Sequence, residues 1–406
     1  MTTKMLHFIA RRFDTGKLAR FDIDEGRIAR VKEYSGDVEK ARSLPWVAPG
    51  FVDIQVNGYG GQEFSSLALT PESVAAIVRQ HWAFGVTGLC PTLTTQSFDC
   101  LVHGLQAIDF ACRNFSDIAR SVIGIHLEGP YISSEDGPRG AHPREHCRQP
   151  TWEEFQHLQE AAGGRIRLLT MSPEFPDSGE FIARVSAHQV VVAIGHTTAN
   201  GEQIGAAVEA GARLSTHLGN GAHGVIRRHP NYIWHQLAED RLMASLIVDG
   251  HHLPPEVVKT IVRAKSPERS ILVSDVSGLA GLPPGRHASS GGDVEVLSDG
   301  RLVVAGQDQL LAGAVAPIGV GIVNVMRFVG VGLPTAVAMA GLHPSQLLGR
   351  VGGTLRPGDV ADLVLFDLDV SACTPLIASA QAGRGQLTVR ATVVAGDLVY
   401  GQLPAD

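Results

Sequence analysis

Cysteine is scarce in this chain, and its placement excludes architectures built on disulfides. Five cysteines occur in 406 residues, an odd number without a CxxC pair. They are scattered along the chain at Cys90, Cys100, Cys112, Cys147 and Cys373. This usage argues against a disulfide framework and against a cysteine-based structural zinc site, and it predicts a reducing, cytoplasmic compartment.

Long hydrophobic runs are also missing. The most apolar long segment, Leu310 to Met326, is interrupted by three glycines, a proline and an asparagine. It is shorter than the about 18–20 apolar residues that a membrane-spanning helix needs. The start of the chain, MTTKMLHFIARR, has only a short apolar patch broken by His7, without the apolar core of a signal peptide. We therefore expect a soluble protein with no membrane partner.

Blocks of like charge are absent as well. The chain has 34 basic and 41 acidic residues, a formal net charge of −7, and no basic stretch. This pattern predicts no nucleic-acid partner. Apolar residues make up 44% of the chain, enough for a sizeable core. The length exceeds the range of about 250–300 residues at which single cores stop growing, so one large domain with a smaller companion is expected.

The two ends of the chain resemble each other. Residues 1–49 read as short strands joined by turns such as Asp24-Glu25-Gly26, and the same style returns from about residue 354. We infer one small β-sandwich formed by residues 1–49 and 354–406. The remaining residues, 50–353, form the large domain, which begins after the Ala48-Pro49-Gly50 boundary.

The large domain alternates apolar strands with helical stretches. Helix start signals include Thr70-Pro71-Glu72 and Thr151 followed by two glutamates. The Gly/Pro/Ser-rich segment 278–292 reads as a long, partly mobile loop. The eight strands expected are residues 51–56, 86–93, 122–128, 165–171, 190–196, 214–218, 243–249 and 270–275. Eight such units predict a (β/α)₈ TIM-like barrel, an α/β fold whose catalytic groups come from the carboxyl ends of several strands.

Four of these strands end in residues that can bind a metal or transfer a proton. Glu128, His196 and His217 end the third, fifth and sixth strands, and Asp275 ends the eighth. One carboxylate and two imidazoles are a ligand set that leaves open positions on a catalytic divalent ion. Such an ion lowers the pKa of its water and polarises a carbonyl, while Asp275 can move the proton. A single histidine among 17 would more often be a hydrogen-bonded core residue. Convergence from four strands favours a metal-dependent hydrolase.

Other polar residues have competing explanations. Gln55 and Asn57 end the first strand, where turn chemistry and a substrate contact are equally good readings. His142 lies in a Gly-rich loop and Arg228 in a basic patch, and both patterns are typical of solvated surface residues. The planar guanidinium group of Arg228 is nevertheless well suited to binding phosphate or carboxylate. His252 follows the seventh strand.

Nearly the whole chain resembles the N-acetylglucosamine-6-phosphate deacetylases of the amidohydrolase superfamily. The motifs that carry the resemblance are APGFVDIQVNGYGG, GIHLEGPYIS with the later GAHP, AIGHTTA, STHLGNG, IVDGHHL, LVSDVSG, LAGA and GTLRPGDVADLVLFD. The set HLEGP, GHT and THL in this order is specific, although each is weak alone. The resemblance implies the same barrel with a β-sandwich, and a metal-dependent enzyme that converts N-acetylglucosamine 6-phosphate to glucosamine 6-phosphate and acetate.

The resemblance also assigns roles by motif. It implies Glu128, His196 and His217 as metal ligands and Asp275 as the acid/base. The substrate contacts that it implies are Ala141, His142, Asn220, Gly221, Arg228, His252, Leu311 and Ala312. The arginine and histidine matching Arg228 and His252 would bind the phosphate, and one subunit of a homodimer could supply them to the other.

The resemblance leaves the metal and the sugar open. Relatives with two metals carry HxH after the first strand, but this chain has Gln55-Val56-Asn57, so one ion per subunit is expected. Zinc is favoured, with iron, manganese and cobalt as alternatives. The family's Asn-Ala-Met reads Asn220-Gly221-Ala222 here, and its Asp-Ala-Thr reads Asp275-Val276-Ser277. These departures keep open a deacetylase for an unphosphorylated or differently configured amino sugar. A non-catalytic scaffold with the same fold is the last alternative, because such a protein should have lost metal ligands or the aspartate, and all four residues are present here.

Overall fold

The computed structural model describes residues 5–35, 43–289, 292–369 and 385–404. Its centre is a sheet of eight strands, all paired in parallel, in the order β14-β13-β12-β11-β10-β9-β8-β5. These strands are β5 (Phe51–Val56), β8 (Val86–Thr94), β9 (Ile125–Glu128), β10 (Ile166–Met171), β11 (Val191–Ile194), β12 (Ala212–Ser215), β13 (Met243–Ile247) and β14 (Ser270–Val273). The amide N–H of Asp275 donates to the Gln55 carbonyl at 3.0 Å, which joins the last strand to the first. The predicted (β/α)₈ barrel is therefore confirmed.

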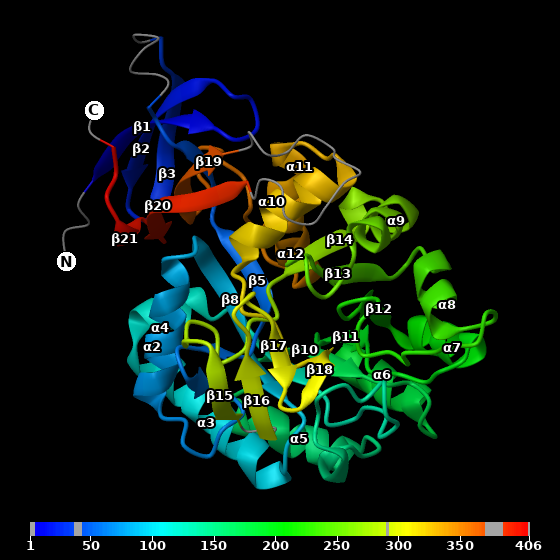
Figure 1. The fold of residues 1–406 in the computed structure, drawn as a ribbon. Helices are drawn as coiled ribbons and strands as arrows, with labels where there is room; N and C mark the ends of the chain where they lie inside the picture. The colour runs from blue at the N-terminus through cyan, green and yellow to red at the C-terminus, as the bar shows by residue number, and fades with distance from the viewer. Residues whose placement is uncertain (1–4, 36–42, 290–291, 370–384, 405–406) are drawn as a thin grey trace.

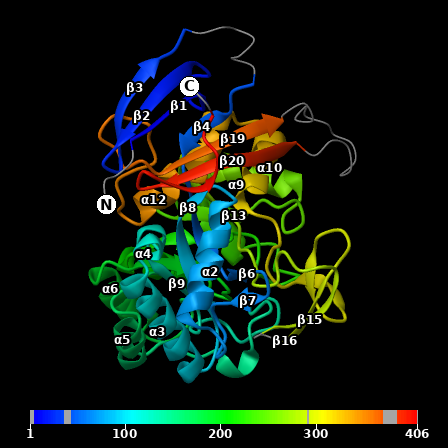
Figure 2. The ribbon, with the colours of Figure 1, turned by 90° about the vertical axis from the view of Figure 1, so that its left-hand side faces the viewer.

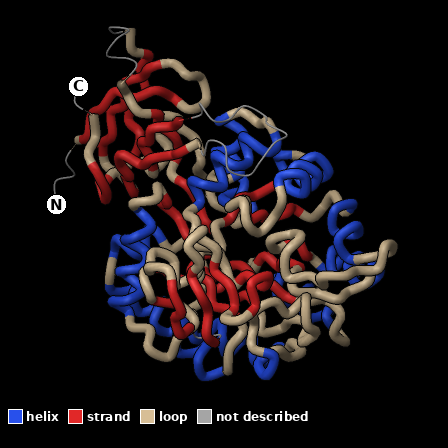
Figure 3. The backbone as a smooth tube through the Cα atoms, in the orientation of Figure 1, coloured by secondary structure: helices blue, strands red, loops and turns tan. Residues whose placement is uncertain are grey.

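Helices surround the barrel (Figures 1 and 3). They are α2 (Pro71–Trp82), α3 (Phe98–Asn114), α4 (Ser116–Ser121), α5 (Trp152–Ala161), α6 (Ser178–Ala187), α7 (Gly201–Ala210), α8 (Tyr232–Ala238), α9 (Pro255–Lys265), α10 (Ile318–Val329), α11 (Leu333–Met339) and α12 (Leu342–Leu347). The predicted start signals are confirmed, because the Thr70 and Thr151 side chains accept hydrogen bonds from the amides of Ser73 and Glu154. No helix among the described residues is long and apolar enough to span a membrane.

Both ends of the chain form one seven-stranded sheet, which lies apart from the barrel (Figures 1 and 2). Its strands are β1 (Leu6–Arg12), β2 (Leu18–Asp24), β3 (Arg27–Glu33), β4 (Trp46–Pro49), β19 (Leu363–Asp369), β20 (Gln386–Val394) and β21 (Asp397–Gly401). The sheet folds over its own apolar core, which includes Phe8, Phe21 and Leu365, and the N–H of Ile28 donates to the Asp359 carbonyl at 2.9 Å. The predicted terminal sandwich is confirmed, whereas its exact boundaries with residues 50–353 stay a prediction.

The segment after the last barrel strand is more ordered than its composition predicts. It begins a four-stranded antiparallel sheet of β15 (Gly285–Ser289), β16 (Gly292–Val296), β17 (Leu302–Val304) and β18 (Gln307–Leu311). The prediction of a loop over residues 278–292 is wrong at residues 285–289, because these residues pair with β16. A small apolar cluster that includes Leu279 and Val294 packs beneath the sheet. A two-stranded ribbon, β6 (Gly58–Tyr59) with β7 (Gln62–Glu63), follows the first barrel strand.

Candidate metal centre and active-site cavity

Three of the predicted functional residues occupy the same kind of turn. His196, His217 and Asp275 each lie two residues beyond the last residue of their strand, β11, β12 and β14 respectively. Their φ angles are 52°, 28° and 50°, in the left-handed region that side-chain-bearing residues rarely adopt. Only five other non-glycine residues in the described part of the chain have a positive φ. Such strain persists where surrounding contacts enforce it, and it gathers at functional sites.

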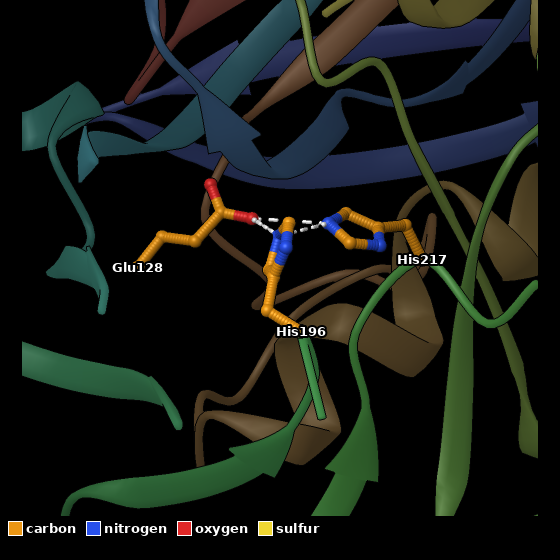
Figure 4. Close-up of side chains that lie close together, drawn as sticks. All are labelled: Glu128, His196 and His217. Carbon is orange, nitrogen blue, oxygen red and sulfur yellow. Dashed lines mark hydrogen bonds and ion pairs between the residues drawn. The ribbon is translucent and has the colours of Figure 1, made fainter. Parts of the chain in front are cut away.

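The turns bring the two imidazoles onto the side chain of Glu128, the last residue of β9 (Figure 4). Glu128 Oε1 lies 3.2 Å from His196 Nε2 and 3.0 Å from His217 Nε2. The two Nε2 atoms are 3.1 Å apart. All three side chains are at most 6% exposed. Among the described residues, these three form the group of carboxylate and imidazole atoms that could hold a metal ion.

The chemistry of this group fits a divalent cation. His196 Nδ1 lies 2.8 Å from the Pro138 carbonyl, which can only accept, so Nδ1 carries the proton and Nε2 presents a lone pair to its neighbours. Burial alone would raise the pKa of Glu128, but the two imidazoles that face its carboxylate outweigh burial and hold this pKa well below its usual value. Burial also opposes a charged His217, yet its bond to Glu128 raises the pKa of the ring. The carboxylate thus requires a buried positive partner, which a metal ion supplies.

Asp275 stands beside this group and is held by two amides. Gln55 Nε2 donates to Asp275 Oδ1 at 3.1 Å and to Glu128 Oε1 at 3.0 Å, and Asn57 Nδ2 donates to Asp275 Oδ1 at 2.8 Å. Burial, followed by the charge of Glu128, raises the pKa of Asp275 to about 6. A carboxyl with a pKa in this range can both accept and return a proton near neutral pH. The structure thus places Gln55 and Asn57 on the candidate base, where the sequence left turn chemistry or a substrate contact as readings.

His142 is buried next to the candidate metal ligands rather than solvated. Its ring packs edge-on against His196, with ring centroids 4.4 Å apart. The backbone N–H of Thr95 donates to His142 Nδ1 at 3.3 Å, so the neutral ring carries its proton on Nε2. Burial, with the neighbouring His196, lowers the pKa of His142 to about 3. The ring is therefore a neutral hydrogen-bond donor at physiological pH.

These groups open into one cavity of about 460 Å³. The candidate metal ligands and Asp275 line it, and eight of the other predicted site residues do so too: Asn57, Ala141, His142, Asn220, Gly221, His252, Leu311 and Ala312. Gln55 is buried behind the lining on the two carboxylates. Arg228 is exposed and lies outside the lining, in the exposed segment 224–230. Its predicted substrate contact stays a prediction.

Several functional candidates were not predicted from the sequence. Asp249, at the end of the seventh strand, accepts a hydrogen bond from His252 Nδ1 at 2.8 Å, and both side chains are 6% exposed. Ser289 and Asp293 of the inserted sheet line the cavity mouth, as does Glu63 of β7. The strand-end position of Asp249 was visible in the sequence, whereas nothing in the pattern indicated that Ser289 and Asp293 line the same cavity.

The chain matches proteins of one enzyme family along most of its length. A family model described as the amidohydrolase family matches residues 46–399. The N-acetylglucosamine-6-phosphate deacetylase of Bos taurus is 34% identical over 365 residues, covering 87% of this chain and 83% of the relative. The N-acetylgalactosamine-6-phosphate deacetylase of Escherichia coli O157:H7 is 29% identical over 347 residues, covering 85% and 89%.

Solved structures agree with this assignment. The crystal structure of N-acetyl-D-glucosamine-6-phosphate deacetylase from Mycobacterium smegmatis superimposes with a TM-score of 0.83 at 28% identity, covering 97% of this chain and 100% of that chain. The enzyme from Thermotoga maritima gives a TM-score of 0.81 at 25% identity, covering 98% and 100%. The chain belongs to the amidohydrolase family, as a member of its N-acetylglucosamine-6-phosphate deacetylase branch.

Proposed function

We propose that this protein hydrolyses the acetamide of N-acetylglucosamine 6-phosphate to glucosamine 6-phosphate and acetate. The observation that carries the proposal is the convergence of Glu128, His196 and His217 beside Asp275 in one cavity. The substrate follows the names of the relatives with which the chain shares most of its length. A non-catalytic scaffold would not need this complete set of buried groups, so we set that alternative aside.

We propose that Glu128, His196 and His217 hold one zinc ion per subunit, with iron, manganese or cobalt as the alternatives that the same ligands accept. When bound, such an ion polarises the amide carbonyl and lowers the pKa of water. A second ion is not expected, because Gln55 and Asn57 stand where two-metal relatives have histidines. Their amides bind Asp275 instead.

In the proposed reaction Asp275 moves the proton. As a carboxylate it accepts a proton from the attacking water, and afterwards it returns this proton to the sugar nitrogen as the C–N bond breaks. The amides of Gln55 and Asn57 hold its Oδ1 in place. His142 donates through Nε2–H to the carbonyl oxygen, on which negative charge develops. Burial keeps the His142 ring neutral, so it donates this hydrogen bond without acting as a second acid in the reaction.

The phosphate requires a second copy of the chain in this proposal. No lysine or arginine lines the cavity of the described chain, and its remaining basic groups near the mouth are His251 and His252. Arg228 lies on an exposed segment that also carries Val225, 93% exposed, and Ile226, 38% exposed. A loop that combines exposed apolar and cationic residues suits insertion into a neighbouring subunit. We therefore propose a homodimer in which Arg228 reaches the partner's cavity.

A cytoplasmic location completes the proposal. Four cysteines in the described part of the chain, Cys90, Cys100, Cys112 and Cys147, are free. Cys373 lies outside the described residues. Free thiols are usual in a reducing compartment.

A different sugar is the second candidate. The cavity lining contains Gly221 and Ala222 where the family pattern has alanine and methionine, so this part of the cavity wall departs from the family pattern. N-acetylgalactosamine-6-phosphate deacetylases are also among the relatives, for example one from Shewanella at 32% identity. A differently configured or unphosphorylated N-acetylhexosamine is therefore the alternative substrate.

One assay separates these candidates. Acetate release is measured from N-acetylglucosamine and N-acetylgalactosamine, each with and without the 6-phosphate, and the metal content of the same sample is determined. Preference for N-acetylglucosamine 6-phosphate supports the proposal, and preference for the galactosamine isomer or a free sugar supports the alternative. Bound metal without acetate from any of the four would refute both.

A further inference from the structure

Glu174 lies outside the cavity lining, yet it binds the segment that follows His196. It belongs to the connection between β10 and α6. Its Oε2 accepts hydrogen bonds from the hydroxyls of Ser172 and, at 2.7 Å, Thr197. Its Oε1 accepts from the backbone N–H of Thr198 at 3.2 Å and from the Thr198 hydroxyl at 3.0 Å. Four donors therefore converge on one carboxylate, and three of them come from the two residues after His196.

These contacts act on a backbone that would relax if it were free. His196 has a φ of 52°, a conformation in which its Cβ is crowded by its own backbone. On its N-terminal side, the N–H of Gly195 donates to the Met171 carbonyl at 3.2 Å. The carbonyl of His196 itself accepts from the N–H of Ser133 at 3.0 Å. On its C-terminal side, the contacts to Glu174 fix residues 197 and 198. The turn is thus held from both ends.

The two imidazole ligands are held in place by different means. The turn of His217 is held by neutral groups: the N–H of His217 donates to the Ser245 hydroxyl at 2.7 Å, the N–H of Leu218 donates to the Ser245 carbonyl at 3.0 Å, and the His217 carbonyl accepts from the N–H of Asn220 at 2.9 Å. For His196, a carboxylate collects four hydrogen bonds from the turn and from Ser172. A charged acceptor forms stronger hydrogen bonds than a neutral one. The turn of His196 therefore depends on one side chain more than the turn of His217 does.

We propose that Glu174 is a positioning residue that holds His196 in the orientation required of a metal ligand. This inference rests on the metal centre of the proposed function. A carboxylate suits the role because it has acceptor capacity on both oxygens and no proton to donate. Glutamine would fit the same space, but its NH₂ group would face donors in place of one acceptor oxygen. The turn would then lose at least one anchor and the position of His196 Nε2 would vary.

The test compares Glu174→Gln with the unchanged full-length protein. We expect its dissociation constant for Zn²⁺, measured by competition with a chelator, to rise about 10–100-fold, as is typical when a group that orients a metal ligand is lost. The stabilisation that Zn²⁺ gives in thermal unfolding should shrink in parallel. The visible spectrum of the Co²⁺-loaded variant should differ from that of the unchanged protein, because it reports ligand geometry directly.

A matched control removes another part-buried carboxylate. Asp109, on α3, is 13% exposed and bonds to Arg113 and Arg165 at 2.9 and 3.0 Å, away from the cavity lining. Asp109→Asn should lower the unfolding temperature of the metal-free protein and leave Zn²⁺ affinity unchanged. If both variants lose affinity equally, or if Glu174→Gln binds Zn²⁺ with unchanged affinity and an unchanged Co²⁺ spectrum, the inference is wrong.

A milder variant covers the case in which Glu174→Gln does not fold. Thr198→Val removes only the Thr198 hydroxyl, and we expect a smaller loss of Zn²⁺ affinity in the same direction; unchanged affinity would overturn the inference. Failure of the proposed function would look different. The protein without any substitution would then show no Zn²⁺ binding or no deacetylation, independently of Glu174.

Discussion

At the residue scale, the site separates proton transfer from metal binding. Asp275→Asn keeps an oxygen that can accept from Gln55 and Asn57 but removes the group that takes the proton. We expect kcat to fall about 10²–10⁴-fold, with the metal content unchanged. Acetate release and elemental analysis of the same preparation check this. The control Asp299→Asn, on an exposed turn, should behave like the unchanged protein, and full turnover by Asp275→Asn would rule out the proposed mechanism.

The pair Asp249 and His252 gives a second prediction at this scale. Burial would raise the pKa of Asp249, but the hydrogen bond with His252 outweighs it and keeps this pKa at about 2. Asp249 also accepts from the backbone N–H groups of His251 and His252 at 2.8 and 2.9 Å. It therefore fixes the proton on His252 Nδ1 and directs the other nitrogen toward the cavity.

Asp249→Asn should weaken the binding of a phosphorylated substrate more than that of a free sugar. Losing a hydrogen bond to a charged group costs about 1.5–3 kcal/mol, which corresponds to a rise in KM of roughly 10–100-fold. Steady-state kinetics with the phosphorylated and free sugars measures the difference. A fall in kcat at unchanged KM would instead place this pair in the chemical step and contradict the prediction.

At the element scale, the junction between β5 and β14 contains a buried carboxylate. Asp53 Oδ1 accepts from the backbone N–H groups of Gln55 and Ser274 at 3.3 and 3.2 Å, and the side chain is buried. Burial raises its pKa to about 7, whereas an unfolded aspartate has a pKa of about 3.9. Between these two values the folded state holds a proton that the unfolded state has lost. Stability due to this group therefore falls as the pH rises from about 4 to about 7.

Asp53→Asn should remove this loss of stability with rising pH. The amide keeps an acceptor oxygen for the two N–H groups and cannot ionise. We therefore expect the variant to have a free energy of unfolding at pH 8 that is higher than that of the unchanged protein by roughly 1–4 kcal/mol, with a smaller difference at pH 5. Urea unfolding of metal-free protein at both pH values measures this. An equal effect of the substitution at pH 5 and pH 8 would show that Asp53 does not titrate in this window.

Sequence patterns predict the elements well and the turns poorly. Most of the barrel strands are visible because they are buried, apolar runs, and the helix starts are visible because Thr70 and Thr151 are good caps. The strands before His196 and Asp275 end two residues earlier than predicted, and the strand before His217 ends three residues earlier. Each of these strands ends early because a left-handed turn follows it, and no residue type in the three turns predicts such a turn.

The three residues of the candidate metal centre could be predicted because each stands at the end of its own strand or just beyond it. Contacts between distant segments could not. Gln55 is 73 positions from Glu128 and 220 from Asp275, and only the closed barrel brings these side chains together. Glu174 lies in a loop between two predicted elements and was missed, because its partners at residues 197 and 198 belong to a different βα unit.

At the scale of the whole molecule, the exposed position of Arg228 separates it from the cavity of its own chain. Its carbonyl accepts from Asn231 and from the Trp234 indole at 3.1 and 3.2 Å, so the segment is anchored by its backbone while the side chain remains free to reach outward. In a two-fold dimer each subunit would present the same loop to its partner. Arg228→Ala should then raise KM for a phosphorylated substrate and leave that for a free sugar unchanged.

Mixing two variants that are each impaired at low phosphorylated substrate tests whether Arg228 acts across the dimer. Subunits with Arg228→Ala retain Asp275, and subunits with Asp275→Asn retain Arg228. If the arginine serves the partner's cavity, a mixed dimer contains one site with both groups intact. Random reassociation of equal amounts should therefore restore about a quarter of the normal sites at low phosphorylated substrate. If Arg228 serves its own subunit, every site in the mixture lacks one of the two groups, and activity would not exceed that of the separate variants.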